Sequence, residues 1–133
     1  MLDGWCIVVV DDNPDVLAVL EEILTSNGAI VHPASSAAAA RETLISIRCD
    51  VLLSDIGMPK EDGYSLIRWL RGWERDQGLP AIPAVAMTGL IEFADPVVSL
   101  RAGFHTHLVK PIDAESLVSV IAELLSRGAP ALL

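Results

Sequence analysis

Short apolar runs alternate along this chain with longer segments in which hydrophobic residues recur every three or four positions. A continuous run of four or five apolar residues, many of them β-branched, is typical of a strand buried on both faces of a parallel sheet. A spacing of three or four residues is typical of a helix with one buried face. The pattern predicts strands at residues 6–10, 29–32, 51–54, 84–87 and 104–109.

The segments after these strands carry the start and stop signals of helices. The expected capping residues are Asp12 or Asn13, Ser35 or Ser36, Asp95 and Asp113. Asn27-Gly28 is expected to end the first helix. This alternation of strands and helices predicts an α/β fold, a parallel sheet covered by helices on both faces. In such sheets, ligands bind beyond the carboxyl ends of the strands.

Composition narrows the picture further. With 133 residues, 52% hydrophobic and 20% charged, we expect one globular domain over residues 1–133, with a core at about 5–126 and a loose tail at 127–133. A net charge of -9 argues against nucleic-acid binding and against contact with an anionic membrane. The sequence shows no signal peptide or membrane span, and its two cysteines, Cys6 and Cys49, are expected to be free thiols of a cytoplasmic chain.

Polar residues gather where the predicted strands end. Asp11 and Asp12 follow the first strand, Asp55 the third, Thr88 the fourth and Lys110 the fifth. Three carboxylates brought together repel one another, so they need a cation or shifted pKa values. Hard oxygen ligands suit Mg²⁺, and a hydroxyl and an ammonium beside them suit the oxygens of a phosphoryl group. The set therefore indicates phosphoryl transfer onto a carboxylate.

Four motifs in this order make the chain resemble the receiver domain of two-component response regulators. They are Val8-Val9-Val10-Asp11-Asp12, Ser54-Asp55-Ile56-Gly57-Met58-Pro59 with Asp62-Gly63, Met87-Thr88-Gly89 and Val109-Lys110-Pro111. The resemblance runs from about Trp5 to Leu125. It implies a doubly wound, five-stranded parallel sheet in the flavodoxin-like order 2-1-3-4-5, with helices on both faces.

The resemblance also implies a role for each residue of the site. Asp55 resembles the phosphoacceptor that takes a phosphoryl group from a phosphohistidine, and Lys110 resembles the lysine that pairs with it. Asp11, Asp12 and Asp55, with the backbone carbonyl of Gly57, resemble the Mg²⁺ ligands. The implied partner is a histidine kinase or a histidine phosphotransfer domain.

Thr88 resembles the hydroxyl that moves toward the phosphoryl group and passes the signal to the surface formed by the fourth helix, fifth strand and last helix. His107 stands where the family often has Phe or Tyr as a second switch residue, which suggests a weaker or pH-sensitive switch. The bond between Lys110 and Pro111 is expected to be cis. Because the side chains of Gly57 and Leu90 cannot orient a water, we expect a long-lived acyl phosphate.

Residues 90–98 carry more apolar side chains than one buried helix face needs. An exposed apolar patch often marks a contact site, so partner docking or self-association through the 90–107 region is expected. His105 and His107 could be metal ligands, but a structural role is favoured for the pair. Trp69 and Trp73 are expected to pack on the fold rather than to stack on nucleic acid.

Two other functions fit parts of the sequence. One is a phosphatase with an aspartyl-phosphate intermediate; such enzymes usually carry a second aspartate where this chain has Gly57. The other is an interaction module that works without phosphorylation, against which the complete Asp, Thr and Lys set argues. We favour a phosphorylated switch over a turnover enzyme, either standing alone or excised from a longer protein such as a hybrid histidine kinase.

Overall fold

The computed structural model describes residues 1–58, 60–89 and 100–127. Five strands form one parallel sheet in the order β2-β1-β3-β4-β5, which confirms the predicted fold and strand order. The strands are β1 (Cys6–Val10), β2 (Ile30–Ala34), β3 (Val51–Asp55), β4 (Ala84–Thr88) and β5 (Thr106–Val109).

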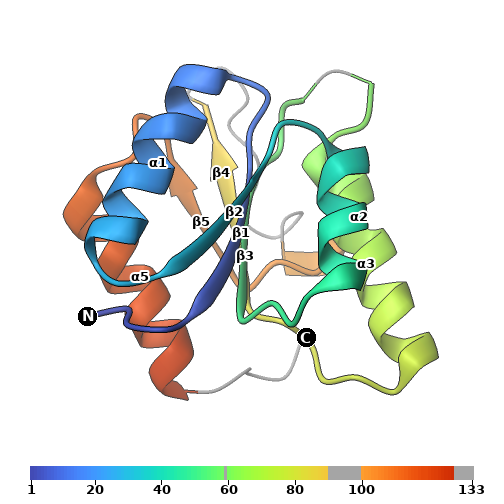
Figure 1. Cartoon of the computed structure of the whole chain (residues 1–133). Coiled ribbons are helices and arrows are strands. Elements are labelled where there is room, and N and C mark those ends of the chain that lie inside the picture. Colours follow the sequence, from blue (N-terminus) through green and yellow to red (C-terminus); the bar gives the residue numbers. More distant parts are fainter. Residues whose placement is uncertain (59, 90–99, 128–133) are drawn as a thin grey trace.

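Helices cover both faces of this sheet (Figure 1). Helices α1 (Pro14–Ser26) and α5 (Ala114–Arg127) lie on one face, and α2 (Ala37–Ser46) and α3 (Gly63–Gln77) lie on the other. The predicted fourth helix and its cap Asp95 fall mainly on residues 90–99, outside the described residues. Among the described residues, no helix is long and apolar enough to cross a membrane.

Alternate residues of the central strands supply the two cores. The core beneath α2 and α3 takes Val8, Val10, Leu52, Ala84 and Ala86 from the sheet. The core beneath α1 and α5 takes Ile7, Val9, Val51, Leu53, Val85 and Met87. Side chains alternate between the faces of a strand, so a central strand with helices on both sides must be apolar throughout. That requirement explains the uninterrupted apolar runs of the sequence.

Side-chain caps fix the helix ends near the sheet. Asn13 Oδ1 accepts hydrogen bonds from the backbone of Asp15 and Val16, so Asn13 caps α1 and neither neighbouring aspartate does. Three other helices begin with a side-chain cap: Ser36 at α2, Asp62 at α3 and Asp113 at α5. Gly78 ends α3 with a left-handed conformation, at φ 68°.

The strand centres agree with the prediction, but several boundaries shift: β3 and β4 each end one residue later than predicted, and β2 and β5 differ more. β2 extends to Ala34 because it is an edge strand, where Pro33 removes no donor that the sheet needs. β5 begins at Thr106, two residues later than predicted, although the His105 N–H still donates to Ala84 O at 2.9 Å. Phe104 lies wholly inside the α2 and α3 core, so its apolar character reflects core packing before the strand begins.

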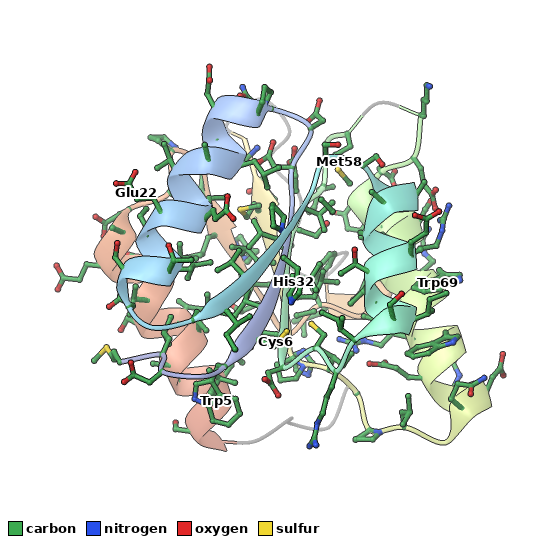
Figure 2. All side chains as sticks on the ribbon, in the orientation of Figure 1. Trp5, Cys6, Glu22, His32, Met58 and Trp69 are labelled. Atoms are coloured by element: carbon green, nitrogen blue, oxygen red, sulfur yellow. The ribbon has the colours of Figure 1, made fainter. Side chains whose placement is uncertain are left out.

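The fold also shows where the two cysteines and the tryptophans lie. Cys6 and Cys49 are free thiols, as predicted. Trp69 and Trp73 stack with ring centroids 6.0 Å apart and pack against the α2 and α3 core, which confirms the packing role. Figure 2 shows Trp69 on the α3 side of the molecule, with Met58 and Trp5 at opposite ends of the fold.

Candidate functional site

Strand register brings the predicted site residues to one edge of the sheet. Val10 pairs with Ser54, so Asp11 and Asp55 follow paired positions on neighbouring strands. Thr88 pairs with Val109 across β4 and β5, and Lys110 follows Val109. All of these residues lie at the carboxyl end of the sheet, the upper end in Figure 1. The topology therefore gathers residues that are up to 99 positions apart in the sequence, from Asp11 to Lys110.

Three carboxylates form the centre of the site. Asp11 is fully buried, Asp55 is 2% exposed, and Asp12 lies exposed at the surface. One carboxylate oxygen from each lies within 4.8 Å of the others. Asp11 Oδ1 accepts from the backbone N–H of Asn13 at 2.9 Å, which fixes the carboxylate just before α1 begins.

Lys110 joins the two buried carboxylates. Its Nζ lies 2.9 Å from Asp11 Oδ2 and 3.3 Å from Asp55 Oδ2. Burial alone would lower the pKa of Lys110, but the hydrogen bond to Asp11 and the charges of both aspartates outweigh it and raise the pKa. The lysine is therefore held in its cationic form against the acceptor candidate. The Lys110-Pro111 bond is cis, as predicted.

The carboxylate of Asp55 is held by the loop that follows β3. Its Oδ1 accepts from the backbone N–H of Gly57 at 3.2 Å. Burial and the nearby charge of Asp11 raise the pKa of Asp55 to about 6, even though Lys110 and the Gly57 N–H act in the opposite direction. The site thus lacks enough positive charge for its three carboxylates, a condition that favours binding of a cation.

One polar group at this edge has no partner in the described part of the chain. The Thr88 side chain is 1% exposed, and its Oγ1 makes no hydrogen bond there. A buried hydroxyl without a partner costs free energy, so its retention at a ligand edge points to a bound group that completes it. Carboxylate oxygens, a backbone carbonyl and water form a donor set that Mg²⁺ accepts, so these residues fit that ion.

His107 lies within β5 and pairs with Ala86, below the strand ends where the cluster forms. His105 lies before β5, and its Nδ1 accepts from the backbone N–H of Ala84 at 3.0 Å. That contact supports the structural role predicted for His105. Within the described ranges, the only group that could hold a metal is Asp11, Asp12 and Asp55.

The structure gives some residues roles in the site that the sequence did not predict. Asn13 orients Asp11, and Gly63 lets the start of α3 approach β3: a Cβ added there would lie 2.3 Å from the carbonyl oxygen of Asp55. Asp62-Gly63 belongs to one of the four motifs, but the motif does not tell which backbone the glycine must approach. No sequence signal distinguished the buried Arg71 and Glu74 from an ordinary exposed pair.

Comparison with known proteins gives the family. The family model of the response regulator receiver domain matches residues 7–122. The chain belongs to this family. The sheet order described above is the one that the resemblance implied.

Relatives and solved structures agree with this assignment. The transcriptional regulatory protein GltR of Pseudomonas aeruginosa is 33% identical over 126 residues, which cover 95% of this chain and 51% of GltR. The receiver domain of the TMAO respiratory system response regulator TorR has a TM-score of 0.82 and 31% identity, covering 93% of this chain and 98% of that one.

A third comparison concerns a receiver from a different kind of protein. The signal receiver domain of a signal transduction histidine kinase from Syntrophus aciditrophicus has a TM-score of 0.80 and 32% identity, covering 98% of both chains. The receiver domain described here spans about half the length of GltR and of TorR from Escherichia coli. Receiver domains of a response regulator and of a histidine kinase therefore share this fold.

Proposed function

We propose that this receiver domain is a phosphoacceptor switch that takes a phosphoryl group from a phosphohistidine onto Asp55. The observation that carries the proposal is the contact of Lys110 Nζ with Asp55 Oδ2 at 3.3 Å, inside a buried cluster of carboxylates and beside the unpartnered hydroxyl of Thr88. The receiver family and the polar strand ends support it together.

The proposed chemistry is a displacement at phosphorus. A carboxylate oxygen of Asp55 forms the new P–O bond while the P–N bond of the phosphohistidine breaks, and the imidazole leaves with the electron pair of that bond. Mg²⁺, held by Asp11, Asp12, Asp55 and the Gly57 carbonyl, would neutralise charge on the phosphoryl oxygens. Lys110, whose Nζ lies 3.3 Å from Asp55 Oδ2, would neutralise part of the same charge.

Thr88 is the proposed sensor of the phosphoryl group. Its unpartnered Oγ1 gains an acceptor when phosphoryl oxygens reach the site. His107 lies on the neighbouring strand, three residues before Lys110, and is proposed to share the switch. The resulting change would reach the surface formed by the fourth helix, β5 and α5. Leu90 and most of the 90–107 region lie outside the described residues, so slow phosphate loss and self-association remain predictions.

A hollow beside Lys110 supports a protein as the phosphoryl donor. It has a volume of about 270 Å³ and lies between α1 and the segment after β5. Its lining is Asp15, Val16, Val19, Leu20, Lys110, Pro111 and Ile112. Val19 is 55% exposed at this place, although α1 has its own buried face. We propose that a histidine kinase or histidine phosphotransfer domain docks here, in the cytoplasm.

Intact mass spectrometry after incubation with Mg²⁺ and acetyl phosphate tests this function. We expect one added phosphoryl group in the wild type, none without Mg²⁺ and none in Asp55→Asn. Asp76→Asn is the matched control: Asp76 is an exposed aspartate of α3 outside both the carboxylate cluster and the hollow, so this variant should be labelled like the wild type. Labelling that survives in Asp55→Asn would overturn the assignment of the acceptor.

The same experiment separates the alternatives. Rapid, steady hydrolysis of acetyl phosphate with little adduct would support the phosphatase interpretation. The absence of both adduct and hydrolysis, together with no Mg²⁺-dependent response to beryllofluoride, would support an interaction module that works without phosphorylation. A stable adduct would support the switch.

A further inference from the structure

Arg71 and Glu74 are two charged residues of α3 that are almost fully buried. Their exposed fractions are 5% and 2%, and neither belongs to the carboxylate cluster. Buried charges cost free energy unless they are paired and hydrogen-bonded, and a buried ion pair is seldom more stabilising than apolar residues of the same size. Stability alone therefore does not explain why this core contains them.

Their contacts join α3 to two other segments. Arg71 donates from Nε and Nη2 to the carbonyl oxygen of Gly103, at 3.0 and 2.8 Å. Arg71 Nη1 also donates to both carboxylate oxygens of Glu74, at 2.9 and 3.1 Å. Glu74 Oε2 in turn accepts from the backbone N–H of Ile82 at 2.7 Å. The pair thus holds the segments that precede β4 and β5.

Gly103 is shaped to receive this side chain. Its φ is 129°, and a Cβ added to it would lie 2.9 Å from Arg71 Cγ and 3.2 Å from Ile67 Cγ1. A residue with a side chain would therefore be strained in its backbone and would push the arginine away. The fit of glycine, guanidinium and carboxylate defines what we call the α3 clamp, made of Arg71, Glu74 and Gly103.

The clamp sits at the start of the strand that delivers Lys110. Two residues after Gly103, His105 exchanges hydrogen bonds with Ala84, through its backbone N–H at 2.9 Å and its Nδ1 at 3.0 Å. β5 then runs beside β4 until the backbone N–H of Lys110 donates to Thr88 O at 2.6 Å. The position of the lysine therefore depends on how β5 is anchored at its beginning.

The opposite end of α3 touches the acceptor strand. The backbone N–H of Gly63 donates to Ile56 O at 2.9 Å, and the close approach of Gly63 to Asp55 O leaves no room for a side chain. The first residue of α3 therefore contacts β3, the strand of Asp55. The second half of the same helix anchors β5, the strand that leads to Lys110.

We propose that Arg71 and Glu74 are positioning residues for phosphorylation: the α3 clamp braces β5 so that Lys110 is held against Asp55. The part of this inference that concerns phosphoryl transfer rests on the proposed function. The part that concerns the anchoring of β5 does not, so the two can fail separately.

The variant Arg71→Met/Glu74→Gln tests the anchoring. It removes both charges and the tether to Gly103, while the glutamine amide oxygen can still accept from the Ile82 N–H. We expect amide hydrogen exchange to become at least about tenfold faster in β5 and at Lys110, with β1 and β3 unchanged. Arg75→Met is the control. Arg75 is an exposed arginine four positions along the same helix, so this variant should leave hydrogen exchange in β5 and at Lys110 unchanged.

Unchanged exchange in β5 would overturn the proposal, and so would equal acceleration in every strand, because that result signifies general destabilisation. If the double variant fails to fold, Arg71→Lys gives the same readout. It keeps a cation beside Glu74 but lacks the fork that binds the Gly103 carbonyl twice.

The link to Lys110 is tested with acetyl phosphate and Mg²⁺. We expect phosphorylation of the double variant to be about tenfold slower than that of the wild type, since a displaced catalytic group typically costs that much or more. In a Lys110→Ala background, the same two substitutions should change the rate by less than about twofold, because they act through the lysine. An equal loss in both backgrounds would contradict positioning through Lys110. A wild type that takes up no phosphoryl group would instead refute the proposed function, and hydrogen exchange would still decide the anchoring.

Discussion

The buried carboxylate of Asp55 lowers the stability of the folded protein when it is ionised and no cation is bound. Its pKa of about 6 in the folded protein lies above the ordinary value of about 3.9 for an unfolded chain. Between these values the folded protein binds more protons than the unfolded one, so stability falls as pH rises through that window and the loss is complete above about pH 6. A site built to attract a cation and a phosphoryl group carries this cost while neither is bound.

Asp55→Asn should therefore stabilise the Mg²⁺-free protein at neutral pH. We expect a gain of about 1–3 kcal/mol in the free energy of unfolding near pH 7.5, shrinking as pH falls toward about 4. Urea unfolding at several pH values measures it, with the exposed Asp76→Asn as the control. A gain that is equal at all pH values would show that the charge of Asp55 is not its cause.

Thr88 gives a second prediction at the level of one residue. Its buried Oγ1 has no hydrogen-bond partner in the described part of the chain, so Thr88→Val removes an unsatisfied group and keeps the β-branched shape that suits β4. We expect stability to rise by up to about 1 kcal/mol, and the response to beryllofluoride to weaken.

Thermal unfolding measures the change in stability. The control is Thr43→Val, because Thr43 Oγ1 donates to Ala39 O at 3.1 Å and its loss should give no gain. A destabilised Thr88→Val protein would mean that the hydroxyl has a partner in solution.

The individual site residues differ in how far the sequence predicted them. Asp11, Asp55 and Lys110 were predictable because each follows an apolar strand, and a parallel sheet brings such positions to one edge. Arg71 and Glu74 were not, since an arginine three residues before a glutamate has the spacing of an exposed helical ion pair. The burial of the pair depends on tertiary contacts, such as those with the Gly103 carbonyl and the Ile82 N–H, that local spacing does not predict.

At the level of elements, α3 is constrained most by its first residue. A Cβ at Gly63 would lie 2.3 Å from Asp55 O and 2.9 Å from Ile56 Cα, and backbone atoms cannot move aside as a flexible side chain can. We expect Gly63→Ala to destabilise the protein by about 1–3 kcal/mol and to slow phosphorylation, because it shifts α3 away from the acceptor strand.

Gly72 in the same helix is the matched control. A Cβ at Gly72 meets only Arg75 Nη2, at 3.9 Å, so Gly72→Ala should stabilise the protein by roughly 0.5–1 kcal/mol. Urea unfolding and the acetyl phosphate assay measure both variants. Similar effects of the two substitutions would show that the contact with Asp55 does not constrain α3.

The element boundaries show where pattern reasoning loses accuracy. Strand centres were predicted well because burial on both faces demands apolar runs, whereas the start of β5 was placed two residues early. Phe104 is apolar because it fills the core beneath α3, and hydrophobicity does not distinguish that from strand pairing. Register, and with it the meeting of Lys110 with Asp55, follows from backbone pairing that hydrophobic pattern alone does not encode.

At the level of the whole molecule, the net charge of -9 adds to the local repulsion between the carboxylates. Any cation relieves general repulsion by screening, but only an ion bound in the folded state stabilises it by a saturable amount. Mg²⁺ at about 100 times its dissociation constant should add about 2.7 kcal/mol to the free energy of unfolding. For a chain of this size, that corresponds to a rise in melting temperature of roughly 8–13 °C.

We therefore expect MgCl₂ to raise the melting temperature of the wild type along a saturation curve, and NaCl of equal ionic strength to give a smaller, gradual rise. In Asp11→Asn and Asp55→Asn the Mg²⁺ curve should collapse onto that of NaCl, because each variant removes a buried carboxylate of the cluster. Asp76→Asn changes the net charge by the same amount and should keep the full response. A Mg²⁺ effect that survived in both cluster variants would place the ion elsewhere and would remove the cation from the proposed mechanism.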